Sequence, residues 1–422
     1  MSSKTEPASG LLALDIGTEF IKCALAEPLD PKFRSGRLKL LGVSKTRQSA
    51  GAMRGGAIAD IPAVVAGCET ALSELEKKTG KTAKSVVVGI SGELVKGSTT
   101  TIRYRRDAPA KPITDAELRE LLEKIEARAE AKVREEISLE TDNPEVDLSL
   151  INSALVSLSI DGYKINNPVG FRGSEVLIEY YTAFAPSFAV SAIEKVCVEL
   201  ELDLLAVVVE PFAVCRACLG DEIDVDFSAV LIDVGGGTTD LAVVDAGGIC
   251  GTKMFNIAGQ AFTRQIAETL GIKPETAERY KVNLEDDSIL SDTVITKTTG
   301  ALSRSLAVWL SGVEVALDEF HNVSPLPSDV FLSGGSSNLL PLEEALATAN
   351  WYESLPFERR PVIHLLDPLT LPDFDFSDTE VASALDSSFI TALGLLRVAV
   401  DTLIATPNQN SLRAKLSKLL SH

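Results

Sequence analysis

The sequence predicts an α/β protein of two lobes, with a small α+β subdomain inserted into the first lobe. Three observations support this fold class. Apolar strands alternate with amphipathic helices along most of the chain, as in sheets that helices cover. A unit of strand, glycine turn and strand over residues 11–25 recurs over residues 229–244, which indicates a duplication. Between residues 92 and 172 the pattern changes to a charged helix and polar strands.

The elements of the first lobe follow from hydrophobic periodicity and turn residues. Asp60–Lys78 has apolar residues at helical spacing and is followed by Gly80, which predicts a helix that ends there. Inside the insertion, Thr114 and Glu117 form a capping box that starts a helix extending to Ser138. The other elements expected before residue 210 are strands at Leu11–Leu14, Phe20–Ala26, Ser85–Ser91, Thr99–Arg106, Leu155–Asp161, Glu175–Phe184 and Leu204–Val209, and a helix at Ser187–Leu200.

The second lobe repeats the alternation of strands and helices. A long helix is predicted at Lys297–Asn322, where apolar residues recur along one side. The acidic segment Asp367–Glu380 is expected to be a surface loop. The remaining elements are strands at Ala229–Ile232, Leu241–Val244 and Ser328–Leu332, and helices at Gln260–Leu270, Thr276–Leu284 and Ser388–Thr402.

Composition disfavours several classes of protein. Of the 422 residues 45% are hydrophobic, which is enough for buried cores, and the net charge of −20 argues against a nucleic-acid binder. No apolar run approaches the length of a transmembrane helix. Cys215 and Cys218 lack the second pair of ligands that a zinc site needs. The scattered cysteines fit unpaired thiols in a reducing cytosol.

Two glycine turns carry the predicted chemistry. Asp15-Ile16-Gly17-Thr18 follows one strand, and Asp233-Val234-Gly235-Gly236-Gly237-Thr238-Thr239-Asp240 follows another. Glycine permits close approach of the backbone, so amide N–H groups of each turn can hold phosphate oxygens. The aspartate at each strand end suits a hydrated Mg²⁺ ion. Two such hairpins facing one another would hold a polyphosphate from both sides.

Two further features would complete a nucleotide site. A third turn contains Gly334, Gly335 and Ser336 and could border an adenine ring, or it could be only a strand-to-helix loop. Glu278 and Lys281 lie on one helix face and could bind a ribose, or they could be only a solvated pair. The chain has neither a P-loop motif nor GxGxxG after a strand, which disfavours those two kinds of nucleotide site.

In their order along the chain, these motifs resemble those of the superfamily of actin, the heat-shock chaperone ATPases and the sugar kinases. Glu210-Pro211-Phe212-Ala213 and Ala392-Leu393-Gly394 are similar to its two connecting motifs. The resemblance implies a two-lobed, actin-like (ribonuclease H-like) ATPase fold that holds ATP and Mg²⁺ between the lobes. It implies catalytic roles for Asp15, Glu210 and Asp233, with Mg²⁺ held through water by Asp15 and Asp233. The implied nucleotide ligands are Gly17, Thr18, Gly235, Gly236, Gly237, Thr238, Glu278, Lys281, Gly334, Gly335 and Ser336.

Within that superfamily, the chain is most similar to the FtsA family of bacterial cell-division proteins. Arg54–Ile61 resembles the segment that enters the family's first long helix, and Val87–Gly92 and Asn166–Gly173 resemble those that enter and leave its inserted subdomain. The resemblance covers nearly the whole chain. It implies slow ATPase activity at most, self-association into filaments, binding to the C-terminal tail of the tubulin-like FtsZ, and tethering of FtsZ to the inner membrane at the division site.

Two segments depart from the family pattern. Glu19 and Phe20 follow the first hairpin, where relatives place small hydroxyl residues and sometimes lysine. Because a carboxylate near phosphates would repel them, we expect Glu19 to face outward. The loop 283–296 is strongly acidic, and it lies in the region that would face the FtsZ tail.

The C-terminal segment has the pattern of a membrane anchor. A polar linker, Thr406–Asn410, precedes a ten-residue amphipathic stretch. Each of its cations contributes on the order of 1 kcal/mol at an anionic surface, whereas ordering the segment costs roughly 1 kcal/mol per residue. One copy would bind marginally and many copies in one assembly would bind stably; a docked or disordered terminal helix is the alternative. The predicted membrane-binding residues are Leu412, Arg413, Lys415, Leu416, Lys418, Leu419 and Leu420.

These segments predict the following division of the chain. The first-lobe core comprises 11–91 and 173–225, with the inserted subdomain at 92–172 between them. The second lobe comprises core segments 226–257 and 327–390 and an outer subdomain at 258–326. A closing helix on the first lobe (391–405) leads to the linker and tail (406–422).

Two other functions compete with this interpretation. A pilus-assembly protein of the PilM type, which would recruit a peptide of an inner-membrane protein, suits Glu210–Ala213 and Lys22 nearly as well. Asn167–Gly170 and the basic leucine-rich tail favour FtsA. A sugar kinase would need an acidic general base facing a substrate hydroxyl, and the sequence shows no such constellation.

Overall fold

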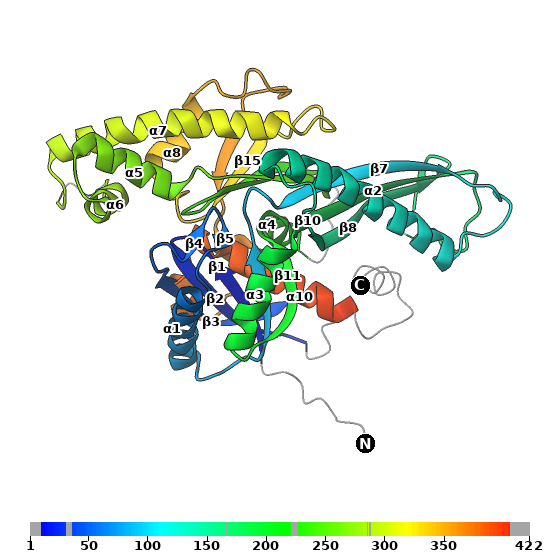
Figure 1. Ribbon diagram of the computed structural model, residues 1–422, viewed down its shortest axis with the longest axis horizontal. Coiled ribbons are helices and arrows are strands. Elements are labelled where there is room, and N and C mark those ends of the chain that lie inside the picture. Colours follow the sequence, from blue (N-terminus) through cyan, green and yellow to red (C-terminus); the bar gives the residue numbers. More distant parts are fainter. Residues whose placement is uncertain are drawn as a thin grey trace.

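The fold is α/β with two lobes and an insertion, as the sequence predicted (Figure 1). The computed structural model describes residues 10–30, 36–165, 167–220, 227–284, 286 and 288–405. The predicted membrane tail at 406–422 lies outside these described residues. Within the described ranges, no helix is both long and apolar enough to cross a membrane.

The first lobe is built on a mixed sheet that has six strands within the described ranges, in the order β11-β6-β1-β2-β3-β17. Helices α1 (Ile61–Thr79) and α3 (Ser187–Glu199) cover one face, and α10 (Ile390–Ala405) packs against the other. Because both faces are covered, β1 is buried along its whole length. The strands are β1 (Leu11–Ile16), β2 (Phe20–Pro28), β3 (Leu38–Arg47), β6 (Ser85–Ile90), β11 (Asp203–Val209) and β17 (Phe374–Asp375).

Part of the segment Asp367–Glu380, predicted as a surface loop, belongs to this sheet instead. Strand β17 pairs in parallel with the start of β3, where Phe374 lies opposite Leu38, and Phe374 is buried. The prediction was wrong there because a two-residue strand has no periodicity to detect. Its partner is also far away in the sequence.

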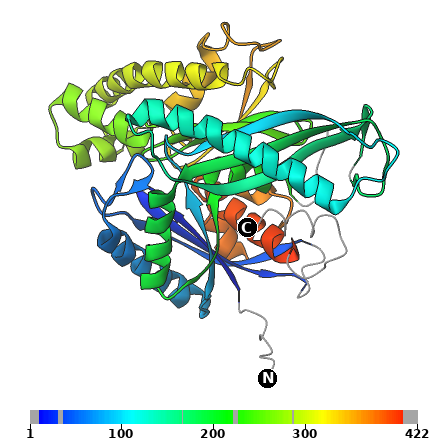
Figure 2. The ribbon, with the colours of Figure 1, turned by 45° about the vertical axis from the view of Figure 1, so that its right-hand side comes forward.

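The second sheet runs through the second lobe and the insertion without a break (Figure 2). Its order within the described ranges is β16-β15-β12-β13-β14-β7-β10-β8-β9. The two parts meet where β14 pairs with β7, and a Cβ atom on Gly97 there would lie 2.2 Å from the hydroxyl oxygen of Thr252. A larger residue here would force the Thr252 and Tyr181 side chains to move. The strands are β7 (Lys96–Arg105), β8 (Leu148–Ile160), β9 (Tyr163–Lys164), β10 (Glu175–Pro186), β12 (Ala229–Val234), β13 (Thr239–Asp245), β14 (Gly248–Phe255), β15 (Asp329–Ser333) and β16 (Val362–Leu365).

The two lobes are joined by a helix crossing between the sheets. Helix α4 (Glu210–Leu219) packs against both α10 and the second sheet. At the crossing, a Cβ atom on Gly394 would lie 2.1 Å from the carbonyl oxygen of Ala213, so the two helix backbones touch. Ala213 belongs to the first predicted connecting motif, and Gly394 belongs to the second.

Local sequence sets where α1 and α2 begin. A side-chain oxygen of Asp60 accepts a hydrogen bond from the Ala63 N–H at 3.1 Å, and Gly80, at φ 65°, ends α1. The Thr114 hydroxyl accepts from the Glu117 N–H at 3.2 Å and starts α2 (Asp115–Thr141). The end at Gly80 and the Thr114 cap were predicted, whereas the Asp60 cap was not, and the Glu117 carboxylate pairs with Arg106 instead of closing a capping box. The other elements are β4 (Met53–Arg54), β5 (Ala57–Ile58), α5 (Gly259–Leu270), α6 (Pro274–Val282), α7 (Asp292–Asp318), α8 (Leu340–Thr348), α9 (Thr379–Ser383), and the 3-10 turns η1 (Pro368–Thr370) and η2 (Ser387–Phe389).

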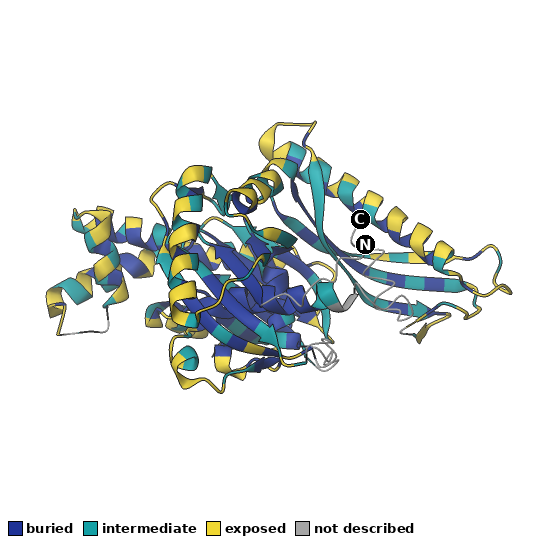
Figure 3. Cartoon of the chain, turned by 90° about the horizontal axis from the view of Figure 1, so that it is seen from below, coloured by how far each residue is buried: buried dark blue, intermediate teal, exposed yellow. Residues whose placement is uncertain are grey.

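The buried core follows the division into lobes. The largest cluster of buried apolar side chains fills the first lobe around its sheet, and a second lies between α7 and the sheet of the second lobe. A smaller one lies beneath α2. Figure 3 shows this pattern: the central strands are buried, whereas the outer side of α2 is exposed. The cleft described next lies between the two large clusters.

Candidate functional site

A cavity of about 320 Å³ lies between the lobes, where the two glycine hairpins meet. It brings together residues from distant parts of the sequence. Of the predicted catalytic and nucleotide-binding residues, Gly334 alone is absent from its walls, which contain Asp15, Gly17, Thr18, Glu210, Asp233, Gly235, Gly236, Gly237, Thr238, Glu278, Lys281, Gly335 and Ser336.

Each hairpin is closed by a hydrogen bond from the first glycine of its turn. The Gly17 N–H donates to the Phe20 carbonyl at 3.1 Å, and the Gly235 N–H donates to the Thr238 carbonyl at 3.0 Å. A Cβ atom on Gly17 would lie 2.6 Å from that Phe20 oxygen, so the first turn requires glycine. Because these two amides serve their own hairpins, phosphate oxygens would be held by other N–H groups of the turns.

The tips of the hairpins pack directly against one another. A Cβ atom on Gly237 would lie 2.5 Å from the hydroxyl oxygen of Thr18, and one on Gly236 would lie 2.7 Å from Cβ of Glu19. Glycine at these positions therefore lets the second hairpin approach the first. The two hairpin tips therefore form one wall of the cavity together.

Glu19 faces this cleft, and the prediction that it points outward is wrong. Its Oε1 accepts a hydrogen bond from Nη2 of Arg47 at 2.5 Å, and its Oε2 accepts from Nε2 of Gln260 at 3.1 Å. Gln260 lies at the start of α5 in the other lobe, and its backbone N–H donates to the Gly236 carbonyl at 2.7 Å. Repulsion from phosphates was the basis of the prediction, and the sequence did not show that partners from β3 and α5 would hold the carboxylate inward.

An ammonium group lies among the carboxylates at the base of the cleft. Nζ of Lys22 donates to Oδ2 of Asp15 at 2.5 Å and to the Ser388 carbonyl at 2.9 Å. Burial opposes the charge of Lys22, but Asp15, Asp233 and Glu210 outweigh burial and raise its pKa. In the sequence, Lys22 was linked only to the competing pilus function. A signal was present, because Asp15 and Lys22 are cross-strand partners in the predicted hairpin.

Burial and mutual repulsion raise the pKa of the neighbouring carboxylic acids. The pKa values of Glu210 and Asp240 lie well above the usual range, first because of burial and then because of nearby carboxylates. Burial also raises the pKa of Asp233, although Lys22 and the Thr391 hydroxyl oppose this. One oxygen of Asp240 is buried without a hydrogen-bond partner among the described residues. This excess of buried carboxylate oxygen fits a divalent cation.

The family resemblance implies a cation that is held through water. Across the described ranges, no three acidic, histidine or cysteine side chains converge closely enough to ligate a metal directly. Asp233 is held in place, since the Thr391 hydroxyl donates to its Oδ2 at 2.6 Å. Gly334, at φ 90°, lies behind it, where a Cβ atom would be 2.2 Å from Oδ1. Gly334 therefore makes room for Asp233 instead of lining the cavity.

Glu210 is positioned by both the first lobe and the insertion. It begins α4 directly after β11, and a Cβ atom on Gly89 would lie 2.9 Å from its Oε1. The Val209 N–H donates to Oδ1 of Asn152 at 2.7 Å. Strand β8 of the insertion thereby fixes the end of β11 from which Glu210 projects.

The predicted ribose pair differs in the exposure of its two members. Nζ of Lys281 donates to the Gly259 carbonyl and to the Thr263 hydroxyl, both at 2.9 Å, and pairs with Oε2 of Glu278 at 2.8 Å. These contacts use its three protons, so Lys281 is a buried group that supports α5 and α6. The Glu278 side chain is 22% exposed, and it is the member better placed to meet a ligand.

The third turn packs on the second hairpin. The Ser336 hydroxyl donates to the Gly235 carbonyl at 2.8 Å, and the Ser336 N–H donates to the Val234 carbonyl at 2.9 Å. Gly335 reaches the cavity beside it. Asp240 also lines the cavity; it belongs to the second hairpin motif, but no role was predicted for it. Other cleft residues lie outside the predicted hairpins and were missed: Lys45, Gln260, Asn338, Asp386, Ser388 and Thr391.

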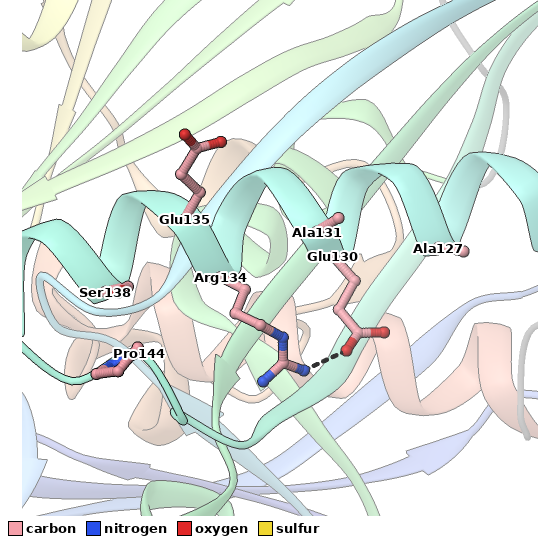
Figure 4. Close-up of a pocket in the computed structure, with 7 residues that line it drawn as sticks. All are labelled: Ala127, Glu130, Ala131, Arg134, Glu135, Ser138 and Pro144. Carbon is pink, nitrogen blue, oxygen red and sulfur yellow. Dashed lines mark hydrogen bonds and ion pairs between the residues drawn. The ribbon is translucent and has the colours of Figure 1, made fainter.

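A second, open hollow of about 400 Å³ lies on the outer side of α2 (Figure 4). Arg134 there pairs with Glu130 at 2.5 Å and also donates to the carbonyl of Val146, whereas Glu135 points away. The guanidinium is therefore engaged by its own subdomain. The cleft between the lobes remains the candidate site.

Comparison with known proteins finds similarity to FtsA cell-division proteins. The family model described as "Cell division protein FtsA" matches residues 230–393. FtsA of Streptococcus pneumoniae is 27% identical over 271 residues, which cover 64% of this chain and 54% of that protein. FtsA of Bacillus subtilis is 23% identical over 345 residues, covering 77% and 73%. This chain spans between 54% and 58% of the length of the first three FtsA relatives that it matches.

Solved structures show the same architecture. The structure of a PilM–PilN type IV pilus biogenesis complex superposes with a TM-score of 0.66 at 18% identity, covering 93% of this chain and 99% of that one. At that identity the likeness concerns the fold alone. The chain is therefore similar to the FtsA cell-division proteins over part of its length, and its fold is actin-like.

Proposed function

We propose that the protein binds ATP with Mg²⁺ in the cleft and acts as an actin-like cell-division protein. One observation carries the proposal: glycine hairpins from opposite lobes face one another across a single cavity, with a buried acidic cluster at its base. The similarity to FtsA supports it, because the matched residues 230–393 include the second hairpin and the third turn.

In this proposal, residues in different parts of the cleft bind different parts of the nucleotide. Amides at the hairpin tips hold the phosphates, and Asp15 and Asp233 orient the water shell of Mg²⁺, which when bound offsets phosphate charge. Glu278 meets the ribose, and Gly335 with Ser336 borders the adenosine. Lys22 offsets the charge of Asp15, to which it is bonded at 2.5 Å.

Calorimetry with Mg-ATP tests the binding step. We expect Asp233→Asn to weaken binding at least about tenfold, because it removes charge from the cation site. Asp245→Asn is the matched control, since Asp245 is exposed at the far end of the same hairpin, and it should bind as the wild type does. Equal affinities for Asp233→Asn and the wild type would contradict the proposed site.

We further propose that the protein self-associates into filaments and tethers the FtsZ tail to the cytoplasmic face of the membrane through residues 406–422. The support is the similarity to FtsA and the basic, leucine-bearing sequence of the tail, which lies outside the described residues. Liposome sedimentation with and without ATP tests this. Full-length protein should pellet with anionic vesicles and protein lacking Ser411–His422 should not. Equal pelleting would contradict the anchor.

A pilus-assembly protein of the PilM type is the second candidate. Lys22 is one of the residues whose identity favoured this function in the sequence. In the structure it lies among the cleft carboxylates, and this placement is the observation that supports the second candidate. Fluorescence anisotropy distinguishes the two. Tight binding of a labelled FtsZ C-terminal peptide supports the cell-division role, whereas binding only of a peptide from a pilus inner-membrane protein supports the alternative.

A further inference from the structure

We propose that Glu19 determines which nucleotide the cleft prefers, by disfavouring a triphosphate relative to a diphosphate. The inference rests on the function proposed above, because it concerns the phosphate end of the same site. It assigns a role to a residue that the sequence placed outside the site and that the structure places within it.

The first step is that the Glu19 carboxylate is fixed between the two hairpins. Arg47 of β3 holds one oxygen at 2.5 Å, and Gln260 of α5 holds the other at 3.1 Å. Cβ of Glu19 also packs where Gly236 lacks a side chain. The carboxylate therefore has partners from both lobes, and turning it out of the cleft would break them.

The second step concerns its charge. Gln260 is neutral, and the Arg47 side chain is 60% exposed, so water and salt weaken its compensation of the carboxylate. The Glu19 side chain is only 22% exposed. A carboxylate in this position adds negative charge beside the hairpin amides that would hold phosphates, and repulsion is stronger in such a partly buried site than in water.

The third step distinguishes the two nucleotides. A triphosphate carries one more phosphate group, and the cleft offers it the amides at the hairpin tips, beside Glu19. The Glu19 carboxylate therefore repels a triphosphate more strongly than it repels a diphosphate. The contacts of Glu19 with Gln260 and Gly236 also join the two lobes at this point, so Glu19 resists separation of the hairpins.

Calorimetry with Mg-ATP and Mg-ADP on the full chain tests the proposal. Glu19→Gln keeps the size of the side chain and removes its charge. We expect it to tighten Mg-ATP about tenfold and Mg-ADP less than about threefold. Arg47→Gln removes the compensating charge, so it should shift the ratio of affinities in the opposite direction. In the double variant the effect of Arg47→Gln should disappear, because the charge on which it acts is gone.

Glu27→Gln is the matched control, since Glu27 lies on β2 away from the cavity and pairs with Lys81 near the surface. It should leave both affinities unchanged. If Glu19→Gln changes both affinities equally or changes neither, Glu19 only shapes the cleft and the specificity role is refuted, while the proposed function stands. If neither nucleotide binds to the wild type or to Glu19→Gln, both proposals are refuted.

Discussion

The crossing of α4 and α10 makes Gly394→Ala a sharp test of how the lobes are joined. The new Cβ atom would lie 2.1 Å from the carbonyl oxygen of Ala213 and 2.5 Å from its carbonyl carbon. Both are backbone atoms, so no side chain can turn away. The helices must separate by about 1 Å to restore an ordinary C···O contact of about 3.3 Å.

The expected cost follows from two opposing effects. Overpacking a tight core contact costs about 1–3 kcal/mol, and the rigid neighbours here place this substitution near the upper end. Alanine gains about 1 kcal/mol over glycine in a helix. The free energy of unfolding should therefore fall by about 2 kcal/mol. Nucleotide affinity should fall as well, because α4 begins with Glu210 and α10 carries Thr391, which holds Asp233.

Gly300→Ala provides the matched control. Gly300 is exposed within α7, and apart from its chain neighbours and the nearby backbone of its own helix, no described atom lies within 4 Å of the position its Cβ would take. The same substitution there should raise the free energy of unfolding by roughly 0.5–1 kcal/mol. Urea titrations followed by circular dichroism would measure both variants. If Gly394→Ala were as stable as the wild type, or gained stability like Gly300→Ala, the proposed backbone contact would be refuted.

Three further predictions concern single residues. Glu117→Gln should destabilise the protein by about 1.5–3 kcal/mol at neutral pH, because Glu117 accepts two hydrogen bonds from the buried side chain of Arg106, at 2.7 and 2.9 Å. Hydrogen bonding to Arg106 lowers the pKa of Glu117, so this stability is present above the ordinary pKa of a glutamate and is lost as the pH falls through the lowered value. The difference in unfolding free energy between Glu117→Gln and the wild type, measured by urea unfolding, should therefore close in acid. The exposed Glu120→Gln is the control, and it should change little. Gly334→Ala should weaken Mg-ATP binding measured by calorimetry, because the residue has φ 90° and its Cβ would lie 2.2 Å from Asp233, and normal affinity would contradict this placement. Thr114→Ala should cost about 1 kcal/mol in thermal or urea unfolding, since it removes the cap on α2, and a wild-type stability would show that the cap is replaced by solvent.

The two hairpins show most clearly how much of the structure could be predicted from the sequence. Each aspartate stands at the end of an apolar strand and is followed by a glycine turn. The strand, the turn and the phosphate-binding groups could therefore be predicted from neighbouring residues. The caps of α1 and α2 were likewise local, because a capping side chain reaches only the next few amides. The hairpin residues at the cleft followed from these local signals, whereas Glu210 was assigned only through the family resemblance.

Other features required partners that are distant in the sequence. Glu19 was assigned to the outside from its charge alone, whereas Arg47 and Gln260, from a different strand and a different lobe, hold it in the cleft. Strand β17 exists only because the start of β3 pairs with it, and the sheet of the insertion joins the second lobe only because Gly97 lets β7 approach β14. The sequence by itself determined the hairpins and the residues that cap the helices, since those depend on short-range geometry. Tertiary structure decided which charges face the cleft and how the lobes are joined, since those depend on contacts between segments that no local pattern encodes.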